Sequence, residues 1–340
     1  MCLDWDAVAL IILIWKKLNT ETVNHWFAGC FVLIICFFPS FKMSSFTVTS
    51  AGRTSIGSYT NRENQDAFLV SDRVFCVADG HGGRGKAVAE MICATVAAKS
   101  ETLGFAELFA AADAAADTLI RTTTTYIDGG GSTASVLKID ADGTCRVAHV
   151  GDSEVRIFDS DEGDGVTLTL DHSVLSLAEF QRVRATHGEA KFLFQNGPYT
   201  TRPVFVETEG EWRLNPLGGF SYCNVRSDWS AYVVSGDRSK LAMTRAIGDF
   251  HMREAGVIST PDVVVVAPHA AGIRAIVLAS DGLWDVMHYS EVCAIVRNPD
   301  CIGDAEAAAD RLMDACLVKG FRLFGTSLDN IALIVIYITV

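Results

Sequence analysis

The stretch Val77-Ala78-Asp79-Gly80-His81-Gly82-Gly83 decides how this chain is read, because a carboxylate follows an apolar run and a glycine follows the carboxylate. A carboxylate at the end of a buried strand is costly unless something positive neutralises it. Gly80 lets the backbone carbonyl approach a cation without interference from a Cβ. His81 is one peptide further on and is suited to protonating a leaving oxygen beside that cation. The stretch therefore predicts a metal-assisted hydrolytic site.

Further aspartates stand in similar turns beside apolar runs. They are Asp152 in Val150-Gly151-Asp152-Ser153, Asp281 in Ser280-Asp281-Gly282, Asp329 in Leu328-Asp329-Asn330, and Asp66 after Asn64-Gln65. Hard carboxylate oxygens suit Mg²⁺ or Mn²⁺. Two such ions about 3.5–4 Å apart can activate water and orient a phosphoryl group. Taken singly, Asp329 reads as a turn or capping residue and Asp152 equally well as a plain turn; only the set favours a shared metal site.

Composition limits the function classes. The chain has 340 residues, 49% of them apolar, and a net charge of −13. No basic stripe is present, so we expect no nucleic-acid partner. Ten scattered cysteines contain no Cys-x-x-Cys pair, which favours reduced core cysteines of an intracellular protein over a zinc or redox site.

Residues 1–42 differ from the rest, with equal numbers of basic and acidic side chains and two apolar runs, Ala7–Trp15 and Trp26–Phe38. Neither run reaches the roughly 20 residues that span a bilayer as a helix. Three interpretations stay open: a membrane anchor or signal anchor, an extension that is not part of the working protein, and a segment packed on the globular domain. Met43 is an alternative start, because every motif follows it.

From Met43 onward, short β-rich runs alternate with alanine-rich helical stretches. The sequence predicts strands at 74–78, 132–139, 145–150, 155–158, 275–279 and 331–339, and helices at 85–99, 105–121, 176–187 and 304–321. Hairpin-like pairs with helices packed outside predict an α+β sandwich. Residues 173–240 read as a less regular, aromatic-rich segment that is either a functional loop or lid, or simply packs on the body.

The order of motifs resembles the metal-dependent protein phosphatases of type 2C, the PPM family. The resemblance runs from about residue 46 to 340 and is carried by Asn64-Gln65-Asp66-Ala67, Asp79-Gly80-His81-Gly82-Gly83, Gly131-Ser132-Thr133-Ala134, Val150-Gly151-Asp152-Ser153, Leu170-Asp171-His172, Thr244-Arg245-Ala246-Ile247-Gly248-Asp249, Ser280-Asp281-Gly282-Leu283-Trp284-Asp285 and Asp329-Asn330. It implies a four-layer αββα sandwich, an antiparallel β-sandwich between helices, with 43–340 as catalytic domain and 173–240 as the flap. It also implies two Mn²⁺ or Mg²⁺ ions per subunit, together with a third, looser ion, for the hydrolysis of phosphoserine and phosphothreonine in proteins.

The resemblance also implies residue roles. His81 is expected to be the general acid, Asp79 the bridging ligand, and Asp152 the ligand of a third, looser ion. The full expected set of metal ligands is Asp66 (through its water shell), Asp79, Gly80, Asp281, Asp329 and Asp152.

The position of the family's phosphate-binding arginine holds Asn61 here, which leaves Arg62 or Arg53 as its replacement. Thr244-Arg245-Ala246-Ile247-Gly248-Asp249 offers a cation and a carboxylate, for which we favour a structural salt bridge. The catalytic residues expected are thus His81, Asp66 and Arg62.

Our leading hypothesis is an active phosphatase of phosphorylated protein substrates, monomeric and cytoplasmic or nuclear. Residues 1–42 would make it membrane-tethered if they act as an anchor. The rivals are a pseudophosphatase that uses the same fold as a binding module and a hydrolase of small phosphorylated metabolites. A pseudophosphatase would be expected to lack one or more core carboxylates, whereas Asp79, Asp281 and Asp329 are all present.

Overall fold

The computed structural model describes residues 45–57, 63–123, 129–188, 190–197, 200–216, 230–236 and 239–340. The chain divides into two compact units, Met1–Met43 and Ser44–Val340, and the described residues all belong to the second. The hydrophobic extension 1–42, Arg62 and parts of the flap therefore lie outside the described residues. Within the described ranges, no helix has both the length and the apolar character needed to cross a membrane.

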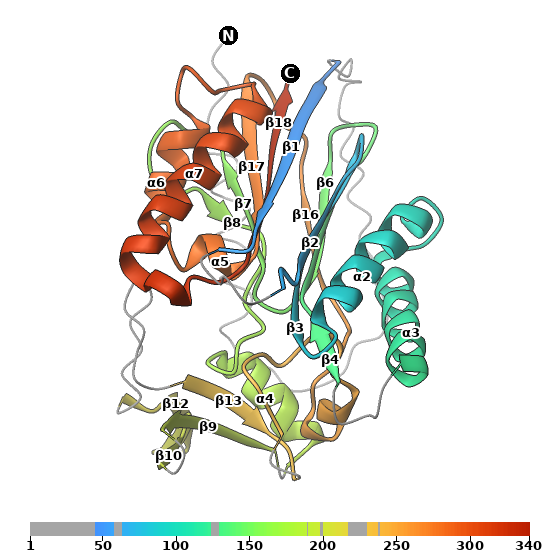
Figure 1. Ribbon diagram of the computed structural model, residues 1–340, viewed down its shortest axis with the longest axis vertical. Coiled ribbons are helices and arrows are strands. Elements are labelled where there is room, and N and C mark those ends of the chain that lie inside the picture. Colours follow the sequence, from blue (N-terminus) through green and yellow to red (C-terminus); the bar gives the residue numbers. More distant parts are fainter. Residues whose placement is uncertain are drawn as a thin grey trace, which may run out of the picture. The chain divides into compact units, whose positions relative to one another are not determined.

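Two antiparallel sheets form the centre of the second unit (Figure 1). The first sheet has the order β1 (Thr47–Ser55), β18 (Ile331–Thr339), β17 (Ile273–Ala279), β7 (Glu154–Phe158) and β8 (Val166–Thr167). The second has the order β15 (Ile247–Gly248), β4 (Gly130–Ser132), β3 (Val74–Gly82), β5 (Ala134–Ile139), β6 (Cys145–Val150) and β16 (Asp262–Val266), with β2 (Asp66–Val70) also paired to β3.

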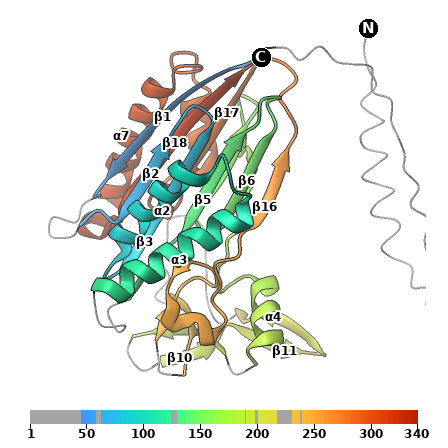
Figure 2. The same ribbon diagram turned by 90° about the vertical axis from the view of Figure 1, so that its right-hand side faces the viewer.

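Helices cover the outer face of each sheet (Figures 1 and 2). The helices α2 (Gly85–Lys99) and α3 (Phe105–Thr123) share a core with the second sheet. The helices α5 (Asp281–Trp284), α6 (Tyr289–Val296) and α7 (Ala305–Phe324) share a core with the first. The arrangement is the predicted four-layer αββα sandwich.

Side-chain alternation along the inner strands explains the layers. In β18, Leu333, Val335 and Tyr337 pack toward the helices, whereas Ile334 and Ile336 join the core between the sheets. Successive side chains of a strand point to opposite faces, and here both faces are covered. An inner strand is therefore an uninterrupted apolar run, and all eight residues of β18 from Ile331 to Ile338 are buried.

Most predicted elements have the predicted type. The strands Cys145–Val150 and Ile331–Thr339 and the helix Gly85–Lys99 match to the residue. The predicted strand 132–139 is instead broken at Thr133 into β4 and β5. At this position the side chain of Thr133 replaces its backbone carbonyl as hydrogen-bond acceptor. The Thr133 N–H donates to the Asp79 carbonyl at 2.9 Å, and the Thr133 Oγ1 accepts from the Asp79 N–H at 2.9 Å.

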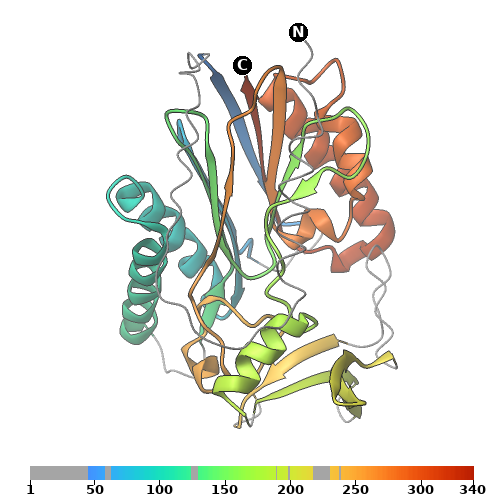
Figure 3. The ribbon, with the colours of Figure 1, turned by 180° about the vertical axis from the view of Figure 1, so that it is seen from behind.

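The described part of the flap is more regular than its sequence suggested. It contains α4 (Leu177–Thr186), a sheet of order β10 (Thr200–Pro203), β9 (Lys191–Asn196), β13 (Ser230–Val234) and β14 (Lys240–Leu241), and the hairpin β11 (Phe205–Thr208) and β12 (Glu211–Leu214). Ser176 caps α4 by accepting a hydrogen bond from the Glu179 N–H. A separate apolar cluster joins α4, β9, β11, β13 and β14 to the 3₁₀ helix η3 (Phe250–Ala255). Figure 3 shows the ribbon of this part of the chain from behind. A second 3₁₀ helix, η4 (Gly325–Ser327), follows α7.

Candidate active site

The site forms where strands of both sheets end. Asp79 of β3 and Asp66 of β2 are directly opposite each other in the antiparallel pair. Asp66 is 7% exposed, and its Oδ2 accepts a hydrogen bond from the Ser280 Oγ at 2.7 Å. Its Oδ1 is buried and has no hydrogen-bond partner among the described residues. A buried carboxylate oxygen without a partner is energetically costly, so this atom marks a place where a cation would be favoured.

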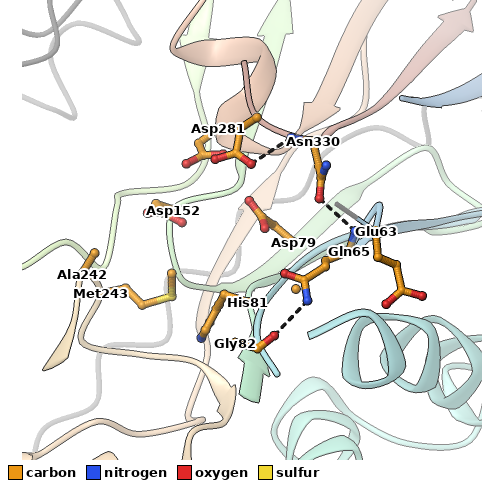
Figure 4. A pocket seen from close by; sticks show the side chains of 12 residues that line it. Glu63, Gln65, Asp79, His81, Gly82, Asp152, Ala242, Met243, Asp281 and Asn330 are labelled. Atoms are coloured by element: carbon orange, nitrogen blue, oxygen red, sulfur yellow. Dashed lines mark hydrogen bonds between the residues drawn. The ribbon is translucent and has the colours of Figure 1, made fainter. Parts of the chain in front are cut away.

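Three more aspartates reach the same region from the neighbouring elements. Asp281 opens α5 directly after β17, Asp329 precedes β18, and Asp152 lies in the turn between β6 and β7. With Asp66 and Asp79 we call these five the rim carboxylates. Four of them line a cavity of about 530 Å³, and Asp66 lies behind it. The cavity lining consists of Glu63, Gln65, Asp79, Gly80, His81, Gly82, Asp152, Ala242, Met243, Asp281, Asp329 and Asn330 (Figure 4).

Three of the rim carboxylates, Asp66, Asp79 and Asp281, have raised pKa values. Burial raises the pKa of Asp66 to about 7, and the nearby Asp281 charge adds to the rise. Burial also raises the pKa of Asp79, and the charge of Asp66 adds to that rise. Burial likewise raises the pKa of Asp281, and the charge of Asp79 adds to it. The described lining of the cavity includes no lysine or arginine. Such a cluster is stable as carboxylates only when cations neutralise it.

The donor set fits divalent ions. Carboxylate oxygens and a backbone carbonyl are the ligands that Mg²⁺ and Mn²⁺ prefer. Among the described residues, no group of three or more acidic, histidine or cysteine side chains converges closely enough to enclose an ion. Mg²⁺ usually keeps several waters and takes one or two carboxylates, so the open cavity and the unpartnered Oδ1 of Asp66 suit that mode of binding.

Gly80 owes its place to a close backbone approach. A Cβ at Gly80 would lie 2.3 Å from the Gly85 carbonyl oxygen, so no larger residue fits between β3 and the start of α2. The Gly80 N–H donates to the Gln65 carbonyl at 3.2 Å. These contacts place the Asp79-Gly80 peptide at the cavity wall.

Side-chain bonds tie the strand ends together across the cavity mouth. The Gln65 Nε2 donates to the Gly82 carbonyl at 2.8 Å, and the Gln65 N–H donates to the Asn330 Oδ1 at 2.9 Å (Figure 4). Asn330 also donates to the Ile56 carbonyl. Residues of the two sheets are thereby fixed relative to each other at the point where the rim carboxylates meet.

His81 lies in the cavity wall with a partner that the sequence did not reveal. Its Nε2 is 2.6 Å from the Asp249 Oδ2, and the two side chains are 26% and 3% exposed. Burial alone would lower the pKa of His81, but the charge of Asp249 and its hydrogen bond raise it, and the net shift is upward. The ring is thus held charged more readily than an ordinary histidine.

The Asp152 turn is held by a buried histidine pair. Gly151 has a positive φ of 92°, and its N–H donates to the His172 Nδ1 at 3.1 Å. The His172 ring stacks on His149, with centroids 4.5 Å apart, and its Nε2 lies 3.2 Å from the Asp262 Oδ2. The positive φ explains why a glycine precedes Asp152.

Arg245 is a structural residue, as predicted, but its partner is not Asp249. Its guanidinium donates to Glu179 of α4 at 2.7 Å and to Asp262 of β16 at 2.7 Å. It therefore joins the flap to the second sheet. Arg53 does not reach the cavity, because it pairs with Asp310 at 2.5 Å and Glu306 at 2.6 Å on α7. That removes one of the two arginines considered for phosphate binding, and Arg62 lies outside the described residues.

A helix-flanked β-sandwich gathers acidic residues at one end, an arrangement suited to binding divalent cations. The family profile described as Protein phosphatase 2C matches residues 42–322. The chain belongs to this family.

The curated relatives are protein phosphatases by name. "Probable protein phosphatase 2C 64" of Oryza sativa subsp. japonica is 27% identical over 302 residues, which cover 81% of this chain and 62% of that protein. "Probable protein phosphatase 2C 6" of the same species is 39% identical over 128 residues, or 32% of this chain and 25% of that protein. "Protein phosphatase 1A" of Bos taurus is 31% identical over 144 residues, or 40% of this chain and 35% of that protein. The chain thus matches less than two thirds of the length of these relatives.

Solved structures share the fold. Serine-threonine phosphatase 2C from Toxoplasma gondii has a TM-score of 0.59 at 19% identity, covering 85% of this chain and 94% of that chain. The catalytic domain of the serine threonine protein phosphatase PstP, solved with two manganese ions, has a TM-score of 0.54 at 17% identity, covering 87% of this chain and 100% of that chain.

Proposed function

We propose that this protein hydrolyses phosphoserine and phosphothreonine in phosphoproteins, using two Mn²⁺ or Mg²⁺ ions held by the rim carboxylates. The observation that carries the proposal is the set of aspartates gathered at one cavity, with an unpartnered Oδ1 on the buried Asp66. Burial and nearby negative charges raise the pKa of Asp66, Asp79 and Asp281. When bound, divalent ions would activate water for attack on phosphorus and neutralise the phosphoryl oxygens.

The residues of the chain take distinct roles in this proposal. Asp79, the Gly80 carbonyl and the carboxylates of Asp281 and Asp329 would hold the two ions, and Asp66 would act through their water shell. A third, looser ion is assigned to Asp152. His81 donates the proton to the leaving serine or threonine oxygen, which its upward-shifted pKa supports. Arg62 is the remaining candidate for holding the substrate phosphate.

The test is turnover of a phosphothreonine peptide by the full chain with and without Mn²⁺, alongside metal content by mass spectrometry. We expect activity that needs Mn²⁺ and about two ions per chain. Asp79→Ala and Asp281→Ala should each lose both activity and metal. A folded protein that takes up no manganese or magnesium would contradict the proposal.

The rival proposal, a pseudophosphatase, has one observation in its favour: Arg53 is engaged on α7 instead of the cavity. It predicts metal binding without turnover. A metabolite hydrolase predicts turnover of small phosphate esters with poor activity on the peptide. The same assay, run with both substrate classes and with Arg62→Ala, separates the three.

The domain division is part of the proposal, with 43–340 as the catalytic domain and 173–240 as its flap. We expect a monomer in the cytoplasm or nucleus, tethered to a membrane only if residues 1–42 act as an anchor. Microscopy of the full chain beside a chain that starts at Met43 tests the tether: identical diffuse distributions would remove it.

A further inference from the structure

His81 and Asp249 form a short, enclosed contact. The proposed role of His81 as general acid does not by itself explain this contact. The two atoms Nε2 and Oδ2 are 2.6 Å apart, and the Asp249 side chain is 3% exposed. We propose that Asp249 is a positioning residue that fixes the ring orientation and tautomer of His81, and that the strand β4 and the helix α3 hold Asp249 in place for this purpose. The inference rests on the proposed function and adds to it a residue with no metal or substrate contact.

Asp249 is held in an unusual backbone conformation. Its φ is +46°, in the left-handed region that few residues other than glycine, asparagine and aspartate adopt. The Asp249 N–H donates to the Gly130 carbonyl at 3.1 Å, next to the pairing of β15 with β4. A conformation of this kind persists only where the surroundings enforce it.

Gly131 leaves just enough room for the Asp249 carboxylate. A Cβ at Gly131 would lie 2.1 Å from the Asp249 Oδ2 and 2.6 Å from its Cγ. Gly131 is also directly opposite His81 in the β3–β4 pair. The same short strand therefore borders both members of the contact, and any side chain at position 131 would displace the carboxylate from the ring.

The helix α3 secures the segment from its other side. The Asp113 Oδ1 accepts from the Gly248 N–H at 3.0 Å and from the Arg253 Nη2 at 2.6 Å. The Arg253 Nη2 also donates to the Gly248 carbonyl at 2.9 Å. Asp113 and Arg253 thus hydrogen-bond to the N–H and the carbonyl of Gly248, the residue before Asp249. The position of the Asp249 carboxylate therefore depends on the helix α3, which lies outside the cavity.

The chemistry follows from which ring nitrogen is engaged. Because Nε2–H donates to Asp249, Nδ1 is the nitrogen that exchanges a proton with the substrate. As the bond between phosphorus and the serine or threonine oxygen breaks, its electron pair stays on that oxygen, which takes the proton from Nδ1. The hydroxyl of the attacking water joins phosphorus, and the remaining proton of that water returns to the imidazole. Water and phosphoester become phosphate and alcohol, with no other reactant.

This role predicts a dependence on the leaving group. An alkoxide is a poor leaving group and needs protonation, whereas p-nitrophenolate leaves without it. Misplacing His81 should therefore reduce turnover of a phosphothreonine peptide much more than turnover of p-nitrophenyl phosphate. A merely structural role of Asp249 would reduce both equally.

The experiment uses the full chain with Mn²⁺ and compares wild type, Asp249→Asn and Gly131→Ala on these two substrates. Asparagine tolerates the left-handed conformation, so Asp249→Asn keeps the backbone. Each variant should lose about a hundredfold in kcat on the peptide, with KM little changed, and only a few-fold on the nitrophenyl ester. In a His81→Ala background, Asp249→Asn should cause no further loss.

Asp117→Asn is the matched control. Asp117 is on the same helix α3, does not line the cavity, and pairs with Arg121 at an N–O distance of 2.6 Å. It should leave both activities unchanged. Equal loss on both substrates, or an additional loss in the His81→Ala background, would overturn the inference.

A second measurement does not depend on activity. In protein labelled with ¹⁵N at histidine, the spectrum of wild type at a single pH should show His81 with its proton on Nε2, and Asp249→Asn and Gly131→Ala should lose that signature. A wild type inactive on both substrates would refute the proposed function, while this spectrum would still decide whether Asp249 orients His81. An unchanged spectrum in both variants would refute the inference alone.

Discussion

Two buried carboxylates in different regions of the molecule have pKa values shifted in opposite directions. Asp66 at the rim of the sandwich is 7% exposed, and burial raises its pKa to about 7. Glu179 of the flap is 4% exposed, yet its pKa is lowered to about 2. Burial alone would raise the pKa of Glu179 too, but hydrogen bonds from Arg245, Arg182 and Thr244 more than offset it. Glu179 has its counter-charges within the chain, in Arg182 and Arg245, whereas the rim carboxylates depend on positive charge from outside it.

On the proposed function, this difference in pKa separates a metal-binding cluster from a structural one. The rim carboxylates lie close to one another, and the cavity that four of them line has no lysine or arginine among its described residues. The Glu179 network is complete: Arg182 donates to it at 2.7 Å, Thr244 at 2.7 Å and Arg245 at 2.7 Å. Removing a member should therefore have opposite consequences in the two places.

The largest expected effect is at the rim. Asp79→Ala should reduce Mn²⁺-dependent turnover by at least about a thousandfold, because the ions contribute several kcal/mol to the transition state. In the metal-free protein the same change should leave the melting temperature unchanged or raise it, since one of several repelling charges is gone. Calorimetry in a chelator checks this, and a markedly lower melting temperature would contradict the comparison.

In contrast to Asp79→Ala, the substitution Arg245→Ala should lower stability. It leaves Glu179 buried with fewer partners and should destabilise the flap by about 3–5 kcal/mol. Hydrogen exchange should show faster exchange at α4, β9 and β13, while β18 and β3 keep their protection. Arg213→Ala is the control, because its partner Glu211 is exposed and the pair should contribute less than about 1 kcal/mol. Equal loss of protection in flap and sandwich would show that the two are one cooperative unit.

The stability difference between wild type and Glu179→Gln should depend on pH. The folded-state pKa of Glu179 lies below its ordinary value of 4.5, so its stabilising effect is fully present above pH 4.5 and is lost as the pH falls toward 2. The difference in unfolding free energy should amount to about 3 kcal/mol at neutral pH and shrink between pH 4.5 and 2. Urea unfolding at several pH values measures it. A difference independent of pH would contradict the prediction.

The smallest expected effects come from substitutions in two apolar cores, that of the flap and that between the two sheets. Phe180 packs on Phe205 and Trp212, with ring centroids 4.5 and 5.1 Å away. Phe180→Leu should cost about 1 kcal/mol, detected only by hydrogen exchange in the flap. Ile334→Val, between the two sheets, should cost a similar amount but lower the global unfolding free energy. If Phe180→Leu also lowered global stability in full, the flap core would not be independent.

The sequence predicted the sandwich wherever a strand is buried on both faces, since such strands are uninterrupted apolar runs. β1 was missed because its sequence TVTSAGRTS mixes small and polar residues and only Ala51 is buried. The flap strands were missed for a related reason: they have four to six residues and partly exposed faces, among glycines and prolines that suggested loops.

The rim carboxylates were predictable because each combines an apolar run with a turn. The partner of His81 was not, because Asp249 is 168 residues away in sequence and its role depends on a left-handed φ and on the absence of a side chain at Gly131. Arg245 illustrates the same limit, since the sequence suggested an ion pair but could not identify Glu179 and Asp262 as its partners. Pairings between distant segments follow from topology, which local patterns do not contain.

The pairing of β1 with β18 has a consequence for biosynthesis. Thr47–Ser55 and Ile331–Thr339 are matched over nine residues, and β18 also separates β1 from β17. During synthesis, both neighbours must wait with open edges until residues 331–339 leave the ribosome. Chaperones that shield exposed strand edges should therefore bind nascent chains that stop before residue 331 and release them once that strand has emerged.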